Sequence, residues 1–93
     1  MYAVLIEVDV AGVDRDEGIA GLHDHLIPAI KRMPGFVSGT WLLGGADGRG
    51  LSLTVWATED DANAFATRFE VGTSPQIGAA VTRSEVREVA ASE

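Results

Sequence analysis

The chain has 93 residues, contains no cysteine, and carries 7 basic against 14 acidic side chains, which gives a formal charge of −7. Its length fits one domain, so we expect residues 1–93 to fold as a single unit. The lack of cysteine excludes disulfides, thiolate nucleophiles and thiolate metal sites. The acidic balance argues against a nucleic-acid partner, because phosphate binding needs clustered Lys and Arg.

The chain shows neither the pattern of a signal peptide nor that of a membrane span. Glu7 and Asp9 interrupt the apolar residues that follow Met1, and no apolar stretch approaches the ~20 residues that cross a bilayer. We therefore expect a cytoplasmic protein with no membrane contact.

The first predicted element is a strand over residues 2–10. Side chains alternate there with period two, and β-branched residues are frequent. One face carries Tyr2, Val4, Ile6, Val8 and Val10, and the other carries Ala3, Leu5, Glu7 and Asp9. Gly12 ends the pattern.

A helix is predicted to begin near residue 14 and to end at Pro34-Gly35. Asp14, followed three positions later by Glu17, resembles a capping box. Apolar residues then recur at helical spacing: Ile19, Leu22, Leu26, Ile30 and Met33. Pro28 lies inside this pattern and lacks an amide hydrogen, so we expect a kink or a short break there.

The second half of the chain predicts a hairpin, a helix and a final strand. Strands over residues 36–43 and 51–56 flank the turn cluster 44–50, which contains Asp47-Gly48. Thr58 with Asp61 forms a second capping box. The apolar face of the helix that follows is Ala62, Phe65, Ala66 and Phe69. Residues 79–89 read as a strand with a bulge, because their valines change parity.

This order of elements predicts an α+β fold of the ferredoxin-like βαββαβ type, a four-stranded antiparallel sheet with two helices on one face. Two helices cover only one face of such a sheet. The other face would expose a large apolar surface, more than monomers usually tolerate. We therefore expect a homodimer in which two copies stack their open sheet faces.

Three segments carry a resemblance to a known family. They are the helix end IPAIKRMPGF, the strand GFVSGTWLL and the junction LTVWATEDDANAF, and their most specific parts are Pro34-Gly35-Phe36 and Trp56 before an acidic helix start. From Tyr2 to about Val89, the chain resembles the dimeric α/β-barrel superfamily, and within it the antibiotic-biosynthesis-monooxygenase-like domains. That superfamily holds cofactor-independent quinone-forming monooxygenases, haem-degrading monooxygenases, isomerases and ligand-sensing domains, so the resemblance implies a fold more than an activity.

The two histidines are candidates for proton transfer or metal binding. His23 and His25 lie two positions apart, about 200° around a helix, so they cannot bind one metal together, and we expect no metal site. His23 lies within roughly 50° of the centre of the apolar stripe and should look along the groove between helix and sheet. It either exchanges a proton with a substrate or is a partly buried histidine bonded to backbone.

Three further residues are candidates for substrate binding. Trp56 and Trp41 fall on predicted strands and could wall a pocket between the first helix and the sheet. The alternative for Trp56 is core packing with its indole N–H satisfied. Asn63, in the first turn of the second helix, could reach the pocket mouth or simply be solvated.

The haem-degrading branch of the resembling family places a tryptophan at the position of Trp56 against the macrocycle. It also uses a histidine in the region of the second helix and an asparagine on the first strand. Residues 59–76 contain no histidine and the first strand contains no asparagine. We therefore expect neither haem nor another cofactor.

Strand charges complete the set of candidates. We expect cross-strand pairs among Glu7, Glu85, Arg83 and Arg87, with the anchoring of a polar substrate as the alternative.

Two functions stay open. One is a cofactor-independent monooxygenase or isomerase acting on an aromatic or polyketide-like molecule, with His23 handling the proton. The other is a non-catalytic dimeric module that binds a small molecule or a partner protein.

Overall fold

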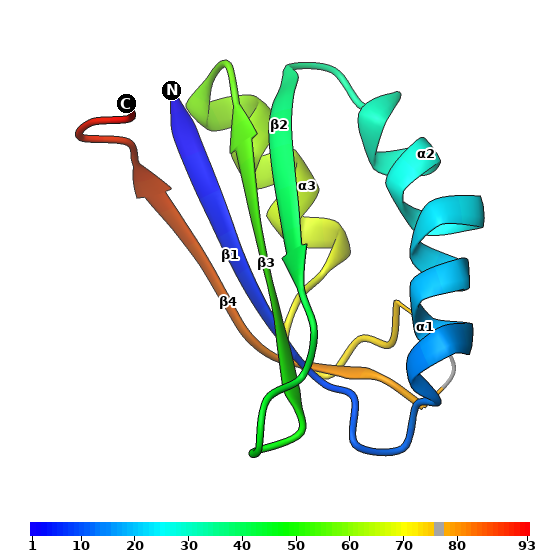
Figure 1. Cartoon of the computed structure of the whole chain (residues 1–93). Helices are drawn as coiled ribbons and strands as arrows, with labels where there is room; N and C mark the ends of the chain where they lie inside the picture. The colour runs from blue at the N-terminus through cyan, green and yellow to red at the C-terminus, as the bar shows by residue number, and fades with distance from the viewer. Residues whose placement is uncertain (76–77) are drawn as a thin grey trace.

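The computed structural model describes residues 1–75 and 78–93, and its elements follow the predicted order (Figure 1). They are β1 (Tyr2–Asp9), α1 (Arg15–Gly21), the π-helical segment η1 (Leu22–Leu26), α2 (Ile27–Lys31), β2 (Phe36–Leu42), β3 (Arg49–Trp56), α3 (Glu59–Arg68) and β4 (Ala80–Glu88). The four strands form one antiparallel sheet in the order β2-β3-β1-β4. The α+β architecture predicted from the sequence is confirmed, although β3 begins at Arg49, inside the stretch expected to be turn.

The first helix begins at its predicted cap and changes geometry just before its proline. The Asp14 carboxylate accepts a hydrogen bond of 3.1 Å from the backbone N–H of Glu17. Over Leu22–Leu26 the helix is π-helical, and the N–H of Ile27 reaches the carbonyl of Leu22. Pro28 follows at once and has no N–H to donate, so the wider turn re-routes the hydrogen bonds around it. The irregularity expected at Pro28 is thus a π-helical turn within a continuous helix.

The second helix, α3, is short and anchored by its buried face. The Thr58 hydroxyl accepts a 3.1 Å hydrogen bond from the Asp61 N–H, as the predicted capping box requires. Ala62 and Phe65 are buried on the face that the sequence pattern assigned to the core. Arg68 in the last turn complements the helix dipole.

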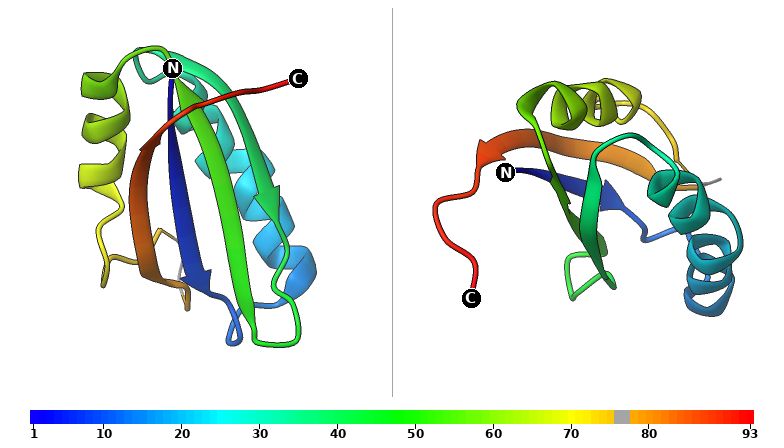
Figure 2. Two further views of the ribbon diagram at one scale, coloured as in Figure 1. Left: turned by 90° about the vertical axis from the view of Figure 1, so that its left-hand side faces the viewer. Right: turned by 90° about the horizontal axis from the view of Figure 1, so that it is seen from above.

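Alternation along the strands divides the sheet into a covered face, on which both helices pack, and an open face. The buried cluster combines strand residues with residues of both helices: Val4, Ile6, Ile30, Trp56, Ala62, Phe65 and Val81. The left view of Figure 2 looks onto the open face, with the α1–α2 helix behind the strands. Both helices therefore pack on one side of the sheet.

Strand β3 points its aliphatic side chains away from the core. Leu53 pairs with Leu5 of β1, and Thr54 pairs with Val4. Since Val4 is buried in the core, Thr54 and its neighbours of the same parity, Ser52 and Trp56, lie on the covered face. Leu51, Leu53 and Val55 lie on the open face. Which face carries Trp56, left undecided by the sequence, is thereby settled.

A bulge in β4 explains the mixed parity of its valines. The register between β1 and β4 shifts between Glu7 and Val8, so that Thr82 has no partner residue across the ladder. The shift places both Val81 and Val86 on the covered face, opposite Val8 and Val4. The bulge predicted from the sequence is confirmed.

Candidate functional site

A cavity of about 290 Å³ lies between the first helix and the covered face of the sheet. The helix contributes Ile19, Leu22 and Leu26 to its wall, and the sheet contributes Ile6 and Trp41. The chain segments that follow β1 and β2 also line the cavity, through residues that include Val13 and Gly44. The lining is largely aliphatic and aromatic, which is typical of small-molecule pockets.

The cavity exists because the first helix touches the sheet mainly near its C-terminal end. Neither α1 nor η1 contains a buried residue, whereas Ile30 of α2 is 3% exposed. Opposite α1 and η1, β3 carries Gly50 and Ser52, which are too small to fill the space between helix and sheet. The covered face of β3 thus grows bulkier from Gly50 through Ser52 and Thr54 to Trp56, away from the cavity.

Polar side chains are few in the described lining of the cavity. Asp14 and Arg15 are exposed at its edge, where Asp14 caps the helix and Arg15 pairs with Asp16 at 3.2 Å. Ser52 is partly buried, and its hydroxyl has no hydrogen-bond partner among residues 1–75 and 78–93. The cavity therefore offers one uncommitted hydroxyl in apolar surroundings.

Trp41 lines the cavity, as predicted from its place on the second strand. Its ring lies over Gly39 on the same strand, where an added Cβ would collide with Cη2 and come within 2.7 Å of Cζ3. Gly39 therefore makes the room that the indole occupies. This dependence on a neighbouring glycine could have been suspected from the Gly-Thr-Trp spacing, because alternate strand residues share a face.

Trp56 is placed in the core and is not among the residues that line the cavity. It is fully buried, and its Nε1–H donates a 2.8 Å hydrogen bond to the Thr54 hydroxyl. Its ring stacks on Phe65 with centroids 4.8 Å apart and meets Phe36 edge-on at 5.6 Å. These contacts match the core-packing alternative stated for this residue.

His23 is exposed and does not line the cavity, so the expectation that it looks along the groove is wrong. The helical-wheel count assumed 3.6 residues per turn throughout, but His23 lies in η1, where the hydrogen bonds span five residues and each residue turns by a smaller angle. Asn63 is also exposed and away from the cavity. The structure thus brings Trp41 to the pocket but not His23, Trp56 or Asn63.

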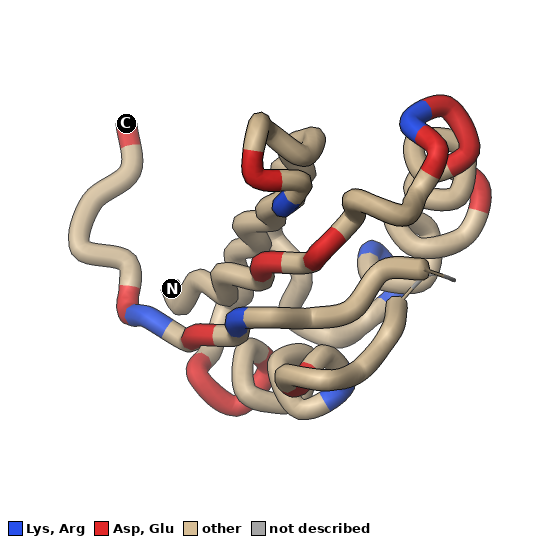
Figure 3. The backbone as a smooth tube through the Cα atoms, turned by 90° about the horizontal axis from the view of Figure 1, so that it is seen from below, with Lys and Arg blue, Asp and Glu red and all other residues tan. Residues whose placement is uncertain are grey.

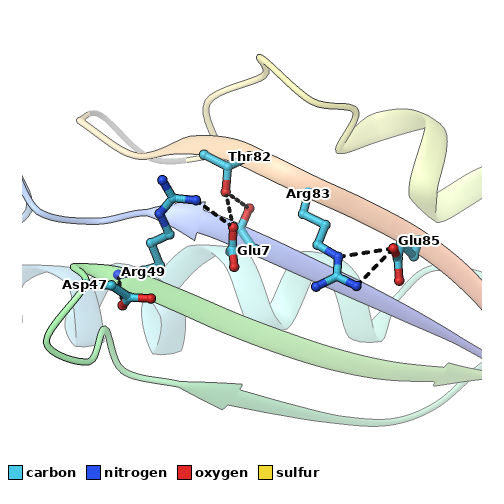
Figure 4. A network of polar contacts seen from close by, with 6 residues as sticks. All are labelled: Glu7, Asp47, Arg49, Thr82, Arg83 and Glu85. Atoms are coloured by element: carbon cyan, nitrogen blue, oxygen red, sulfur yellow. Dashed lines mark hydrogen bonds and ion pairs between the residues drawn. The ribbon is translucent and has the colours of Figure 1, made fainter.

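The open face carries a network of charged residues beside its aliphatic part (Figure 4). Glu7 accepts hydrogen bonds from the Thr82 hydroxyl at 2.8 Å and from Arg49 at 3.1 Å. These two bonds, in that order, hold the pKa of Glu7 below its ordinary value. Arg49 was missed as the partner of Glu7 because the β1–β3 register was unknown. Among residues 1–75 and 78–93, Glu7 forms no ion pair with an arginine of β4, although Arg83 lies opposite it in register and its charge also lowers the pKa of Glu7.

On β4 the charges pair along the strand, not across it. Glu85 binds Arg83 at 3.1 Å and Arg87 at 3.4 Å, two residues away on either side. Figure 3 shows this alternation of basic and acidic residues along the strand. The cross-strand pairing expected for Glu85, Arg83 and Arg87 is therefore wrong, because these residues pair within one strand.

The open face is electrically balanced, unlike the rest of the chain. By strand parity it carries three arginines and three carboxylates: Arg49, Arg83, Arg87, Glu7, Asp9 and Glu85. Because these charges cancel, the entire formal charge of −7 lies off this face.

Two properties of the described residues concern metal ions and membranes. Among residues 1–75 and 78–93, no group of three or more His, Asp or Glu side chains is arranged to hold a metal ion. Across the same residues, each helix is too short or too polar to span a bilayer.

A scan of the chain against protein-family models finds no match, and a search of curated proteins finds no significant relative.

Proposed function

We propose that the protein is a non-catalytic module that binds a small, mainly apolar organic molecule in the cavity between the first helix and the sheet. The observation that carries this proposal is the apolar cavity of about 290 Å³. A cavity of ~150 Å³ lined by aliphatic and aromatic side chains accommodates benzene. The cavity beneath Ile19 and Leu22 is about twice that size, which suits a ligand of roughly two fused rings.

The second candidate, a cofactor-independent monooxygenase or isomerase, is favoured by the same apolar lining, because such chemistry needs a desolvated substrate. It also needs a group that takes the substrate proton. His23 lies outside the cavity, and the Asp14 carboxylate at its edge is engaged as a helix cap. The arrangement therefore supports binding better than catalysis.

Binding can be measured by isothermal titration calorimetry with naphthalene as the probe. Ile19→Trp fills the space beneath the helix and should weaken naphthalene binding at least tenfold. Ala20→Trp is the matched control, because Ala20 is exposed on the same helix and does not line the cavity. If the folded wild-type protein takes up no naphthalene, or if both variants bind it equally, the cavity is not a binding site.

We further infer that the strand order β2-β3-β1-β4 is that of the ferredoxin-like fold, and that two copies stack their open faces as the resembling dimeric α/β barrels do. The support comes from exposed aliphatic residues. Leu42 and Leu53 are 56% and 48% exposed, and both lie on the open face with Leu51 and Val55. Burial of such a patch is the usual reason for association.

The balance of charge favours a second copy over a charged partner. In a symmetric dimer the same patch lies on both sides of the interface, so like charges on it would repel. A face with no net charge avoids this repulsion, and the acidic remainder of each chain stays in solvent.

Sedimentation equilibrium tests the dimer. Leu53→Glu places a charge in the aliphatic patch and should reduce the mass from two chains to one at micromolar concentration. Val71→Glu is the control, since Val71 is 65% exposed but follows α3 and belongs to none of the four strands. A wild-type mass of one chain would contradict the dimer without affecting the proposed ligand cavity.

A further inference from the structure

Ser52 belongs to the middle one of the three strands β1, β3 and β2 that line the cavity. It pairs in register with Ile6 on one side and with Trp41 on the other, and all three line the cavity. Its parity places the side chain on the covered face, facing the helix. The hydroxyl is therefore directed at the space that a ligand would fill.

The hydroxyl of Ser52 is uncommitted, in contrast to that of its neighbour on the same face. The Thr54 hydroxyl accepts the Trp56 indole N–H at 2.8 Å. Ser52 has no such partner within the described residues, and no described side-chain polar atom is both buried and unpaired. The Ser52 hydroxyl thus keeps access to open space, and in this lining that space is the cavity.

We propose that Ser52 determines the specificity of the cavity by hydrogen bonding to a single hydroxyl or carbonyl on an otherwise apolar ligand. This inference rests on the proposed binding function. The ligand is uncharged, because burial of an ion without a paired charge costs far more than one hydroxyl returns. A polar ligand atom that reaches Ser52 replaces its lost water contacts, whereas one placed elsewhere against the aliphatic wall does not.

Three probes with the same ring system compare a ligand with no polar group, one with a hydroxyl and one with a charge. They are naphthalene, 1-naphthol and 1-naphthoate, each titrated by calorimetry at pH 7. Wild-type protein should bind 1-naphthol about five- to tenfold more tightly than naphthalene, the ratio that one neutral hydrogen bond provides. It should bind 1-naphthoate more weakly than either. Ser52→Ala should remove the preference for 1-naphthol and leave the affinity for naphthalene within about twofold.

Ser84→Ala is the matched control. Ser84 lies on the same face and also pairs with Ile6, but from β4, and it is not part of the cavity lining. This variant should leave all three affinities unchanged. Trp41→Phe tests the rival donor, because the Trp41 indole also lines the cavity.

The outcomes separate the two proposals. If naphthalene binds but the preference for 1-naphthol is absent, survives Ser52→Ala, or disappears in Trp41→Phe alone, the assignment of Ser52 is overturned and the binding function stands. Tighter binding of 1-naphthoate than of 1-naphthol also overturns it. If the folded protein takes up no naphthalene, both proposals fall together.

Discussion

The covered face of the sheet is packed in two different ways. Under α3, the rings of Trp56 and Phe65 stack at 4.8 Å, and Phe65 and Phe69 lie at the same separation, where the two phenylalanines also border the cavity. Under α1 and η1, the same face leaves a cavity of about 290 Å³. The size of the side chains along one strand, from Gly50 to Trp56, accounts for the difference. A single strand can therefore supply both a rigid core and an open pocket.

The largest effect is expected in the packed half. Phe65→Ala removes a side chain that is 2% exposed and stacked on Trp56, and it should lower the free energy of unfolding by about 3–5 kcal/mol. Urea denaturation monitored by circular dichroism measures this loss.

The matched change in the other half is Leu22→Ala. Both residues line the cavity, but Leu22 is only partly buried whereas Phe65 is 2% exposed, so the loss of Leu22 should cost about 1–2 kcal/mol, below the range for filled cores. Equal losses for Phe65→Ala and Leu22→Ala would show that the two halves are packed alike.

A second test addresses the polar contact inside the packed half. Thr54→Val keeps the shape of the side chain but removes the acceptor of the Trp56 indole N–H, which is then buried without a partner. The free energy of unfolding should fall by about 1–3 kcal/mol. Thr54→Ser retains the hydroxyl, so thermal unfolding of the two variants distinguishes the hydrogen bond from packing. A more stable Thr54→Val than Thr54→Ser would contradict this account.

A third test displaces the Trp41 ring, which lines the cavity. Gly39→Ala introduces a Cβ that collides with the Trp41 ring, and because this ring is only partly buried it can shift at a cost of about 1 kcal/mol. The fluorescence of Trp41 and the affinity for naphthalene should both change. Gly45→Ala is the control, since its Cβ meets nothing closer than 3.8 Å. An unchanged spectrum in Gly39→Ala would place the indole elsewhere.

The smallest effect is expected on the open face, outside both halves. The pKa of Glu7 is lowered in the folded chain, so its ionised form stabilises the fold above the ordinary value of 4.5, and this contribution disappears as the pH falls through the lower folded pKa. Glu7→Gln should therefore be less stable than wild type at pH 7, with the gap closing below pH 4.5.

Urea titrations from pH 7 to pH 2.5 measure that gap, with the exposed Glu93→Gln as the control. Naphthalene binding at pH 7 should be the same in Glu7→Gln and wild type, because Glu7 faces away from the cavity. A gap that widens in acid would reverse the sign of the assigned pKa shift.

Much of the fold could be predicted because its signals are local. Asp14 and Thr58 each cap a helix by accepting a hydrogen bond from the residue three positions later in the chain. The bulge in β4 follows from the parity of Val81 and Val86. The candidate site was harder to predict. Trp41 was assigned to the cavity wall, but His23 was misplaced because a π turn changes the angle per residue. Ser52 was overlooked because a single serine that belongs to no recognisable motif carries no sequence signal for a binding role.

The sequence by itself determined the order of the elements, their caps and the rise in side-chain size from Gly50 to Trp56, since these depend on neighbours a few residues apart. Only the tertiary structure decided which face of β3 turns inward. Leu51 and Leu53 alternate with Ser52 and Thr54, and a hydrophobic pattern alone would bury the leucines. The register with β1 places Thr54 opposite buried Val4 instead. Strand pairing is a long-range property, and a change of one residue in register exchanges the two faces.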